Sequence, residues 1–386
     1  MAIYLDNAAT SFPKPEAVYR AVDNFLRNIG ASSGRGAYRK ALQADKIAFQ
    51  TRKSLARLFN IQDASRIVFT ANVTESLNLA MQGILKSGDH VVTTSMEHNA
   101  VWRCLKHLEK EKGITITAVP CSPEGYLKVE KLAAALRPDT ALIVLLHASN
   151  VTGTIMPVEQ VGQLARQKNI PLLVDAAQTA GVYPIDMAAM HIDLLAFTGH
   201  KGLLGPTGTG GLYINEKYAI NPFKFGGTGG DSIREDQPDT PPDRFEAGTL
   251  NLAGIAGLGA GVDYILNESI DKIRRHEMEL TGYALDKLRD LASVTIYGPL
   301  DATKQVGVIS FNLPGLKPEQ VAYLLDTKYD IMVRAGLHCA PLAHRTTGTI
   351  DRGTVRVGIG VFNTARDIDD LILALKEIMR FSPFTR

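Results

Sequence analysis

Short apolar runs alternate with amphipathic stretches in the part of the chain before residue 250. The apolar runs are rich in Val, Ile and Leu, which is typical of buried strands. They predict strands at residues 66–70, 90–94, 114–119, 141–147, 171–175, 193–198 and 210–214. Helical periodicity occurs before and between these runs, at residues 16–27, 38–59, 74–86, 101–112, 129–136 and 158–167. Strands that alternate with helices indicate an α/β fold with a largely parallel sheet covered on both faces.

The pattern changes after Thr249. A glycine- and alanine-rich segment at residues 251–261 leads into a long helical stretch at residues 270–291. Further strands are predicted at residues 294–297, 306–312, 331–334 and 354–359, and further helices at 318–325 and 367–379. We therefore expect a large domain over residues 15–258 and a smaller α+β domain over residues 259–386, with the N-terminal segment 1–14 packing near the smaller one.

Length and composition agree with a two-domain enzyme. A chain of 386 residues is longer than one hydrophobic core usually supports, and shares of 45% hydrophobic and 21% charged residues are typical of globular proteins. A net charge of +2 gives no reason to expect nucleic acid or a membrane as a partner. No apolar run approaches the roughly 18 residues of a membrane span, and the first residues lack a signal-peptide pattern. Three cysteines without a CxxC spacing predict a reduced, cytoplasmic protein with no disulfide framework and no metal site.

The most informative segment is residues 196–202, in which Lys201 stands among small residues just after a predicted strand. Asp175 ends another predicted strand. The carboxyl ends of the strands border the ligand crevice of an open α/β sheet, so both side chains are expected to face one site. Alone, a lysine is usually a solvated charge and an aspartate at a strand end is usually a cap or turn former. Together they suit pyridoxal phosphate (PLP), which needs a lysine for its Schiff base and a carboxylate beside its pyridine nitrogen.

Other polar side chains also follow predicted strands. Residues 70–76 open a helix, so free amides and the helix dipole could bind a phosphate, with Thr74 adding a hydroxyl. His98 could stack on a flat ring and handle protons at neutral pH. Asn150 could bond the phenolic oxygen of the cofactor or a substrate carboxylate. Each has a plain alternative, which is helix capping for the first two and turn formation for Asn150.

The smaller unit adds a cysteine and an arginine. Cys339 lies next to a histidine in a loop between a glycine and a proline, where its thiol could have a lowered pKa and be reactive. Cys104 and Cys121 lie in a helical pattern and at a strand end, and we expect them to be inert. Arg356 lies opposite the apolar face of its strand, where it could bind a carboxylate through two hydrogen bonds or simply be solvated.

Several short motifs together resemble a known family. They are Glu97-His98, Ser149-Asn150-x-x-Gly153, Asp175-x-x-Gln178, Thr198-Gly-His-Lys201, Arg244-Phe-Glu-Ala-Gly-Thr249 and Arg334-Ala-Gly-x-His-Cys-Ala340. On these motifs the chain resembles the cysteine desulfurases of the class V aminotransferase family, in the group that includes SufS-type enzymes and selenocysteine lyases. The resemblance runs from residue 4 to residue 356, and the compact loop around Cys339 is similar to that of the SufS-like type.

The resemblance implies the PLP-dependent transferase fold type I, with an active site at a homodimer interface. Lys201 would carry the cofactor, Asp175 would contact its pyridine nitrogen, and His98 would stack on its ring and transfer protons. The remaining roles implied are these: the cofactor phosphate for Thr74, Thr198 and His200, joined by Thr249 of the partner subunit; the ring oxygen and the substrate for Gln178 and Asn150; and the substrate for Arg334 and Arg356.

The activity that the resemblance implies is conversion of L-cysteine to L-alanine, with the sulfur transferred to Cys339 as a persulfide and then to a sulfur-acceptor protein. Two alternatives stay open. One is related chemistry, namely a selenocysteine lyase, which would act on L-selenocysteine, or another class V lyase or aminotransferase. The other is a non-catalytic sulfur-relay scaffold that keeps the fold, although the joint presence of Lys201, Asp175 and Cys339 argues against it.

Overall fold

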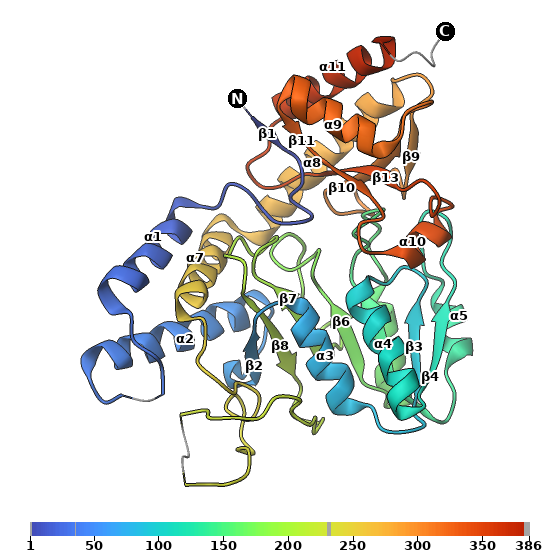
Figure 1. Cartoon of the computed structure of the whole chain (residues 1–386). Coiled ribbons are helices and arrows are strands. Elements are labelled where there is room, and N and C mark those ends of the chain that lie inside the picture. The colour runs from blue at the N-terminus through green and yellow to red at the C-terminus, as the bar shows by residue number, and fades with distance from the viewer. Residues whose placement is uncertain (1, 35, 230–232, 382–386) are drawn as a thin grey trace.

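The computed structural model describes residues 2–34, 36–229 and 233–381. Within these residues the largest sheet has seven strands, in the order β2-β8-β7-β6-β5-β3-β4 (Figure 1). They are β2 (Ile67–Thr70), β3 (His90–Thr94), β4 (Thr115–Val119), β5 (Thr140–Leu146), β6 (Leu172–Asp175), β7 (Leu194–Thr198) and β8 (Gly210–Ile214). β8 runs opposite in direction to the other six strands, and the predicted strand ends differ from these by one residue at most. The predicted mostly parallel sheet is confirmed.

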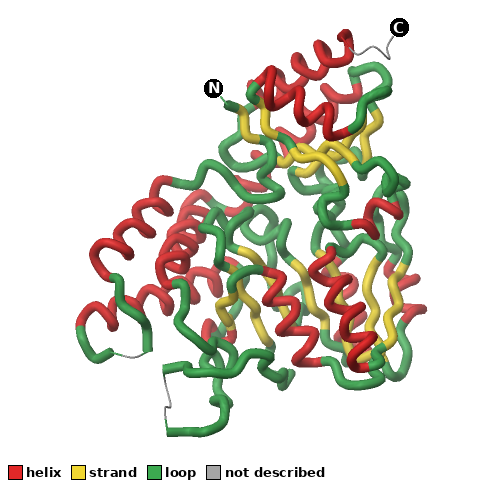
Figure 2. The backbone as a smooth tube through the Cα atoms, in the orientation of Figure 1, coloured by secondary structure: helices red, strands yellow, loops and turns green. Residues whose placement is uncertain are grey.

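Helices cover both faces of this sheet, as Figure 2 shows. On one face α3 (Val73–Ile84) and α4 (Asn99–Lys112) share a core with Leu142 of β5. The next residue along β5, Ile143, belongs to the core on the other face. Because both faces are buried, the strands read as continuous apolar runs in the sequence. Helices that contribute side chains to the second core include α2 (Arg39–Leu58), α5 (Val129–Ala135), α6 (Val158–Lys168) and α7 (Leu252–Glu268).

The glycine- and alanine-rich segment is part of helix α7, which the sequence analysis did not predict. A side chain at Gly261 would place its Cβ 2.5 Å from the carbonyl oxygen of Leu203. The glycines therefore let α7 approach the backbone that follows Lys201 more closely than larger residues would allow. A helix so rich in glycine is not predicted from helix propensity, because each glycine lowers helix stability by about 1 kcal/mol relative to alanine. Two N-terminal elements also lie against α7: α1 (Glu16–Asn24), which continues as the π-helical turn Phe25–Ile29, and α2.

The C-terminal part of the chain forms a second, antiparallel sheet in the order β12-β13-β10-β9. The predicted strand at residues 331–334 is split in two: β11 pairs in parallel with β1, whereas β12 pairs with β13. A short helix that was not predicted follows the Cys339 loop. The elements are β1 (Ile3–Tyr4), α8 (Ile270–Arg289), β9 (Thr295–Tyr297), β10 (Val308–Asn312), α9 (Pro318–Tyr329), β11 (Ile331–Met332), β12 (Arg334–Gly336), α10 (Pro341–Thr346), β13 (Thr354–Gly358) and α11 (Ala365–Phe381).

The second sheet has its own hydrophobic core, to which α8, α9 and α11 contribute. Ile3 and Leu5 from the N-terminal segment also belong to this core. The domain division predicted between residues 258 and 259 falls inside α7, and its outer limits at residue 1 and residues 382–386 lie outside the described residues. The division stays a prediction.

Candidate active site

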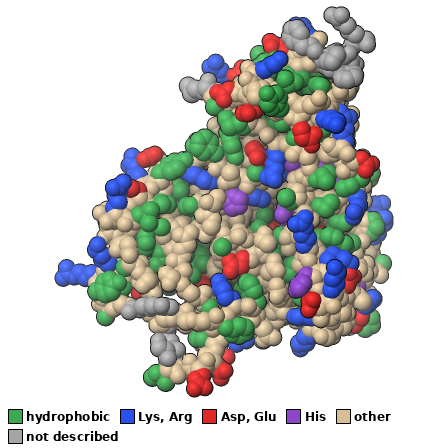
Figure 3. All heavy atoms as spheres, viewed as in Figure 1, with side chains coloured by type: hydrophobic (Ala, Val, Ile, Leu, Met, Phe, Trp, Pro, Cys, Tyr) green, Lys and Arg blue, Asp and Glu red, His purple; other side chains and the backbone are tan. Residues whose placement is uncertain are grey.

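The predicted site residues of the large sheet converge because parallel strands point their carboxyl ends the same way. The segments at the ends of β2, β3, β5, β6 and β7 carry Thr74, His98, Asn150, Asp175, Gln178, Thr198, His200 and Lys201. The second sheet and α10 lie above this edge in Figure 1. Figure 3 shows histidine side chains reaching the surface on this face, where the two parts of the molecule meet. The edge is therefore the candidate active site.

Lys201 supplies an amine at this edge. The residue is partly exposed, but its ammonium lies deep enough for burial to be the main cause that lowers its pKa to about 8. The positive charge of Arg356 lowers this pKa further, while Asp175 opposes the change. The Ser11 hydroxyl donates to the Lys201 carbonyl at 2.8 Å and so fixes the loop. A lysine with such a pKa has a useful fraction of free amine near neutral pH, as a nucleophile requires.

Asp175 is buried, with 5% of its surface exposed. Burial raises the pKa of its carboxyl, although the amide of Ala177, which donates to Oδ1 at 2.9 Å, and the charge of Lys201 act in the opposite direction. The carboxyl would be stabilised as an anion by a cationic group placed against it. Nearby, the Gln178 amide donates to the Ala8 carbonyl at 3.0 Å, which ties the N-terminal segment to this edge.

The structure shows His98 in the capping role, which was the plain alternative in the sequence analysis. It is the N-cap of α4, where its Nδ1 accepts a hydrogen bond from the amide of Ala100 at 3.0 Å. It also lies close enough to Lys201 for the two charges to interact. Burial, and then Lys201, lower its pKa to about 4. Because Nδ1 accepts the amide hydrogen of Ala100, the neutral imidazole carries its proton on Nε2 and presents a hydrogen-bond donor there.

The predicted phosphate site has the expected helix N-terminus. Asn72 caps α3, with its Oδ1 accepting from the amide of Glu75 at 3.0 Å, and Thr74 is exposed in the first turn. The Thr198 hydroxyl is buried and donates to the Thr209 carbonyl at 3.4 Å. His200 Nδ1 is buried and has no partner among the described residues. Burial is the main cause that lowers the pKa of His200 to about 4.

Thr249 lies on an exposed part of the loop before α7, where it lines a surface pocket with Thr70, Ala71 and Glu75. Within the described residues its hydroxyl has no hydrogen-bond partner. Three residues earlier, Glu246 is buried and ion-paired with Arg52, and it accepts the amide hydrogen of Phe69 at 2.6 Å. This anchor fixes the start of the exposed segment against β2.

The Cys339 loop reaches the same edge from the second sheet. The Cys339 carbonyl accepts a hydrogen bond from the amide of Asn99 at 2.9 Å, and the His338 carbonyl accepts one from the Asn150 side chain at 2.6 Å. Cys339 is exposed, and both it and His338 have left-handed backbone angles, with φ of 58° and 48°. Such angles are unusual for residues with side chains and are kept only where the surroundings enforce them.

Arg356 is buried, with 2% of its surface exposed, so it is not a solvated arginine. Its Nη1 donates to the Asn150 carbonyl at 3.1 Å and its Nη2 to the Asp6 carboxylate at 2.8 Å. The Nε atom is buried and has no partner among the described residues. Arg334 stands directly opposite Arg356 in the sheet register, and the charge of Cys339 also acts on Arg356. The structure thus gathers two cations and a thiol beside Lys201.

The sequence analysis missed Asp6 and Glu97 as parts of the site, although Glu97 stands in a motif that it quoted. Asp6 is the ion-pair partner of Arg356. Glu97 is buried at the end of β3, immediately before His98. For Glu97, the available signal was its position immediately before His98, a predicted functional residue. Cys104 and Cys121 are as expected, because burial raises the pKa of each thiol to about 11.

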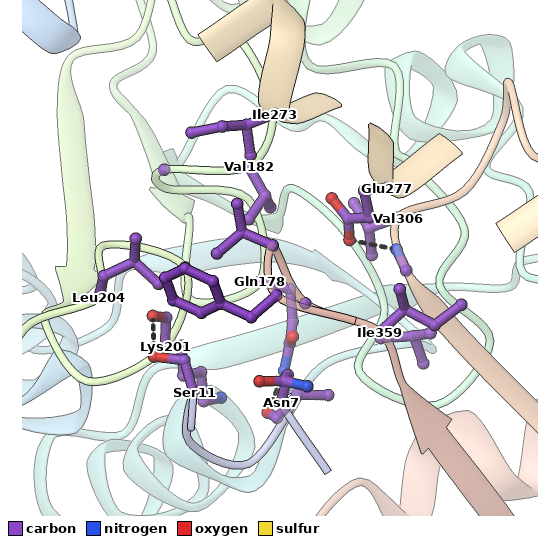
Figure 4. A pocket seen from close by; sticks show the side chains of 18 of the residues that line it. Asn7, Ser11, Gln178, Val182, Lys201, Leu204, Ile273, Glu277, Val306 and Ile359 are labelled. Atoms are coloured by element: carbon purple, nitrogen blue, oxygen red, sulfur yellow. Dashed lines mark hydrogen bonds between the residues drawn. The ribbon is translucent and has the colours of Figure 1, made fainter. Parts of the chain in front are cut away.

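A pocket between the Lys201 loop, the N-terminal segment and the second sheet adjoins this edge (Figure 4). Its lining includes Ser11, Gln178, Lys201 and the buried Glu277. One carboxyl oxygen of Glu277 accepts the amide hydrogen of Gly307 at 2.5 Å, and the other has no partner among the described residues. Burial raises the pKa of Glu277 to about 7.

The unpartnered atoms provide a test of what the edge could hold. His200 Nδ1, the Asn150 side-chain oxygen and Arg356 Nε are all buried without partners in the described part of the chain. Buried polar atoms normally have partners, so these three suit a ligand that carries hydrogen-bonding and anionic groups. A phosphate, a phenolic hydroxyl and an amino-acid carboxylate would satisfy them. The residues therefore fit PLP together with an amino acid.

Comparison with known proteins identifies the class to which this fold and site belong. The sequence matches the family described as aminotransferase class-V over residues 3–371. The chain belongs to this family, and the prediction of the family is confirmed. A probable cysteine desulfurase of Pyrococcus abyssi is 37% identical over 388 residues, which cover 98% of this chain and 94% of that protein. A cysteine desulfurase of Salmonella agona is 36% identical over 386 residues, with 98% and 93% covered.

Solved structures of cysteine desulfurases are also similar to this chain. The apo structure of cysteine desulfurase from Thermococcus onnurineus superposes with a TM-score of 0.92 at 36% identity, covering 98% of this chain and 95% of that one. A cysteine desulfurase from Escherichia coli superposes with a TM-score of 0.89 at 28% identity, with 99% and 95% covered. The predicted fold class is confirmed. No helix in residues 2–34, 36–229 or 233–381 is long and apolar enough to cross a membrane.

Proposed function

We propose that this protein is a PLP-dependent cysteine desulfurase, which converts L-cysteine to L-alanine and leaves the sulfur on Cys339 as a persulfide. The observation that carries the proposal is the attachment of an exposed cysteine loop to the edge that holds Lys201 and Asp175, through hydrogen bonds from Asn99 and Asn150. The cysteine desulfurases to which the chain is similar over nearly its full length support the same activity.

The proposed roles follow from charge and burial. Lys201 binds the cofactor and moves the proton of the substrate Cα, for which its lowered pKa suits it. Asp175 would hold a positive charge on the ring nitrogen, and His98 would stack on the ring as a neutral imidazole. When bound, PLP supplies an electron sink for the substrate Cα. The other proposed cofactor contacts are Thr74, Thr198 and His200 for the phosphate and Gln178 and Asn150 for the ring oxygen.

The substrate carboxylate would be bound by Arg356 and Arg334. The free Nε of Arg356 and one of its Nη atoms could bind the carboxylate through two hydrogen bonds, which is the geometry that arginine favours. Cys339 Sγ then attacks the substrate sulfur. A sulfur–sulfur bond forms while the carbon–sulfur bond breaks, its electron pair goes to the substrate carbon, and a proton completes the methyl group of alanine. The persulfide on the exposed loop would be accessible to a sulfur-acceptor protein.

A homodimer is also proposed, with Thr249 of the partner subunit completing the phosphate site. Thr249 is exposed and has no hydrogen-bond partner in the described part of the chain. Large apolar side chains are exposed in the π-helical turn after α1, at the start of α2 and along it, and in the segment before α7. Exposed apolar patches often mark protein interfaces. The exposed side chains are Leu26 (65% exposed), Tyr38 (58%), Leu42 (57%), Phe49 (53%) and Phe225 (71%).

Release of alanine from L-cysteine tests the proposed function. The wild-type protein loaded with PLP should release alanine and retain a thiol-reducible sulfur on Cys339. Cys339→Ala should still bind PLP but lose alanine release, whereas Cys104→Ala and Cys121→Ala should keep both. Near-wild-type release by Cys339→Ala would exclude the mechanism, and formation of a keto acid in place of alanine would indicate an aminotransferase.

A further inference from the structure

A second buried acid lies at the same edge of the sheet. Glu97 follows β3, and none of its surface is exposed. Its Oε1 atom accepts two hydrogen bonds, from the Thr94 hydroxyl at 2.8 Å and from the amide of Leu146 at 3.3 Å. Its Oε2 atom is buried and has no partner in the described part of the chain. The role of this carboxyl is not explained by the proposed chemistry.

Glu97 closes a gap between two strands. The pairing of β3 with β5 reaches Val92 and Ile143 and goes no further. The amide of His147 points to β6, where it donates to the Asp175 carbonyl, so by alternation the amide of Leu146 points toward β3. Glu97 satisfies this amide in place of the missing strand partner. The carboxyl therefore holds the ends of β3 and β5 together beside Asp175.

The charges around Glu97 favour its neutral form. No basic side chain forms an ion pair with it among the described residues. The ionisable groups that face it are Asp175 on β6 and the thiol of Cys121 after β4, and both would be anions if charged. Burial raises the pKa of Glu97 to about 8, with Asp175 contributing in the same direction. A neutral carboxyl carries its proton on one oxygen, and Oε2 is the one that accepts no hydrogen bond in the described residues. The Thr93 hydroxyl beside the carboxyl is also buried without a partner and could accept a hydrogen bond from that proton.

We propose that Glu97 is a positioning residue, held as a neutral carboxylic acid that closes the β3–β5 edge without placing a second negative charge next to Asp175. Two carboxylates in a dry site cannot both stay ionised, because each raises the pKa of the other. If Glu97 were charged, Asp175 would tend to take up a proton and lose its pairing with a cationic ring nitrogen. The inference thus rests on the role proposed above for Asp175.

Replacing each acid by its amide distinguishes the proposed role of Glu97 from that of Asp175. Glutamine has the shape of neutral glutamic acid and can accept the same two hydrogen bonds, so Glu97→Gln should lose about threefold or less in kcat/KM. Glu97→Ala leaves the Leu146 amide unsatisfied and should retain PLP about tenfold more weakly. Asp175→Asn should lose far more activity, because an amide cannot pair with a cation. Rescue by glutamine at position 97 and not by asparagine at position 175 is the expected signature.

Infrared difference spectroscopy reads the protonation state directly, with or without cofactor. Wild type minus Glu97→Gln at pH 6 should show the C=O stretch of a protonated carboxyl, which disappears as the pH rises through about 8. Thr94→Val, which removes one hydrogen bond to Oε1, should shift the frequency of that band and provides a second assignment if Glu97→Gln does not fold. Absence of the band at pH 6, or a loss in Glu97→Gln as large as in Asp175→Asn, would overturn the inference. Full activity in Asp175→Asn would instead overturn the role of Asp175, and the band would still report on Glu97.

Discussion

The carboxylate of Asp6 lies 2.8 Å from Nη2 of Arg356, and the two residues are separated by almost the whole chain. Arg356 is also the proposed site for the substrate carboxylate, so the substrate would share this guanidinium with Asp6. The Asp6 carboxylate pairs with a cation that is otherwise buried. An incoming carboxylate would compete with Asp6 for one of the Nη atoms.

Replacing Asp6 by asparagine should separate stability from substrate binding. Asp6→Asn leaves Arg356 buried without an anion, and we expect the free energy of unfolding to fall by about 2–4 kcal/mol. The substrate carboxylate then meets no competitor, so KM for L-cysteine should fall about fivefold. Denaturant unfolding with and without L-alanine, together with steady-state kinetics, checks both effects. Asp23→Asn, which removes an exposed ion pair with Arg27, should change neither. A rise in KM for Asp6→Asn would mean that Asp6 orients Arg356 for binding.

The lowered pKa of Lys201 predicts how fast PLP is captured at different pH values. The amine must be neutral to attack an aldehyde, and its pKa is about 8. Below that pH the neutral fraction falls about tenfold per pH unit, so the uptake rate should rise about tenfold from pH 6 to pH 7 and level off above pH 8. Visible absorbance after mixing apo protein with PLP measures the rate. Borohydride should fix the cofactor to Lys201 and not to Lys201→Ala. A plateau near pH 10 would contradict the lowered pKa.

Mixed dimers can show whether Thr249 acts in its own subunit or in the neighbouring one. A dimer of Lys201→Ala with Thr249→Ala keeps one site with both residues intact only if Thr249 acts across the interface, and it should have about half of wild-type activity. The matched control joins a wild-type subunit with one that carries both substitutions, and its activity should be low at limiting PLP. The reverse pattern would place Thr249 in its own subunit. An active monomer would remove the dimer from the proposal.

Two glycines that differ in their surroundings give a matched test of packing. A Cβ at Gly307 would lie 2.4 Å from the Glu277 carboxyl, whereas a Cβ at Gly282 in α8 would have its nearest neighbour at 3.7 Å. Gly307→Ala should therefore lower the free energy of unfolding by about 2–4 kcal/mol. The Glu277 carboxyl would have to move away from the amide at position 307, whose hydrogen bond it accepts. Gly282→Ala should raise it by about 0.5–1 kcal/mol through helix propensity. Equal effects in thermal unfolding would show that the Glu277 contact carries no energy.

The sequence predicted the large sheet closely because its strands are short, buried and apolar on both faces. The same regularity allowed part of the site to be predicted. Asp175 ends strand β6 and Lys201 follows the parallel strand β7. The topology alone therefore places both residues at one edge of the sheet, where their charges interact. Helix α7 was not predicted because its glycines, which allow close packing against Leu203, interrupt the apolar pattern of a helix.

Contacts between distant segments could not be predicted. Asp6 and Arg356 meet only because the N-terminal segment pairs with the second sheet. The Asn150 amide donates to the carbonyl of His338, a contact that depends on how the Cys339 loop folds back. The protonation of Glu97 depends on complete burial beside another acid, and no pattern of apolar and polar residues encodes that.

The pairing of β1 with β11 has a consequence for the order in which the chain can fold. Ile3 and Tyr4 pair with Ile331 and Met332. During synthesis β1 therefore leaves the ribosome long before its partner β11 has been made. Such distant pairing carries a large loop-closure cost and is slow to form. The strands of the large sheet lie between β1 and β11 in the sequence and can assemble meanwhile. The edge that carries Lys201 would then be completed by residues 3–11 only after β11 has been made.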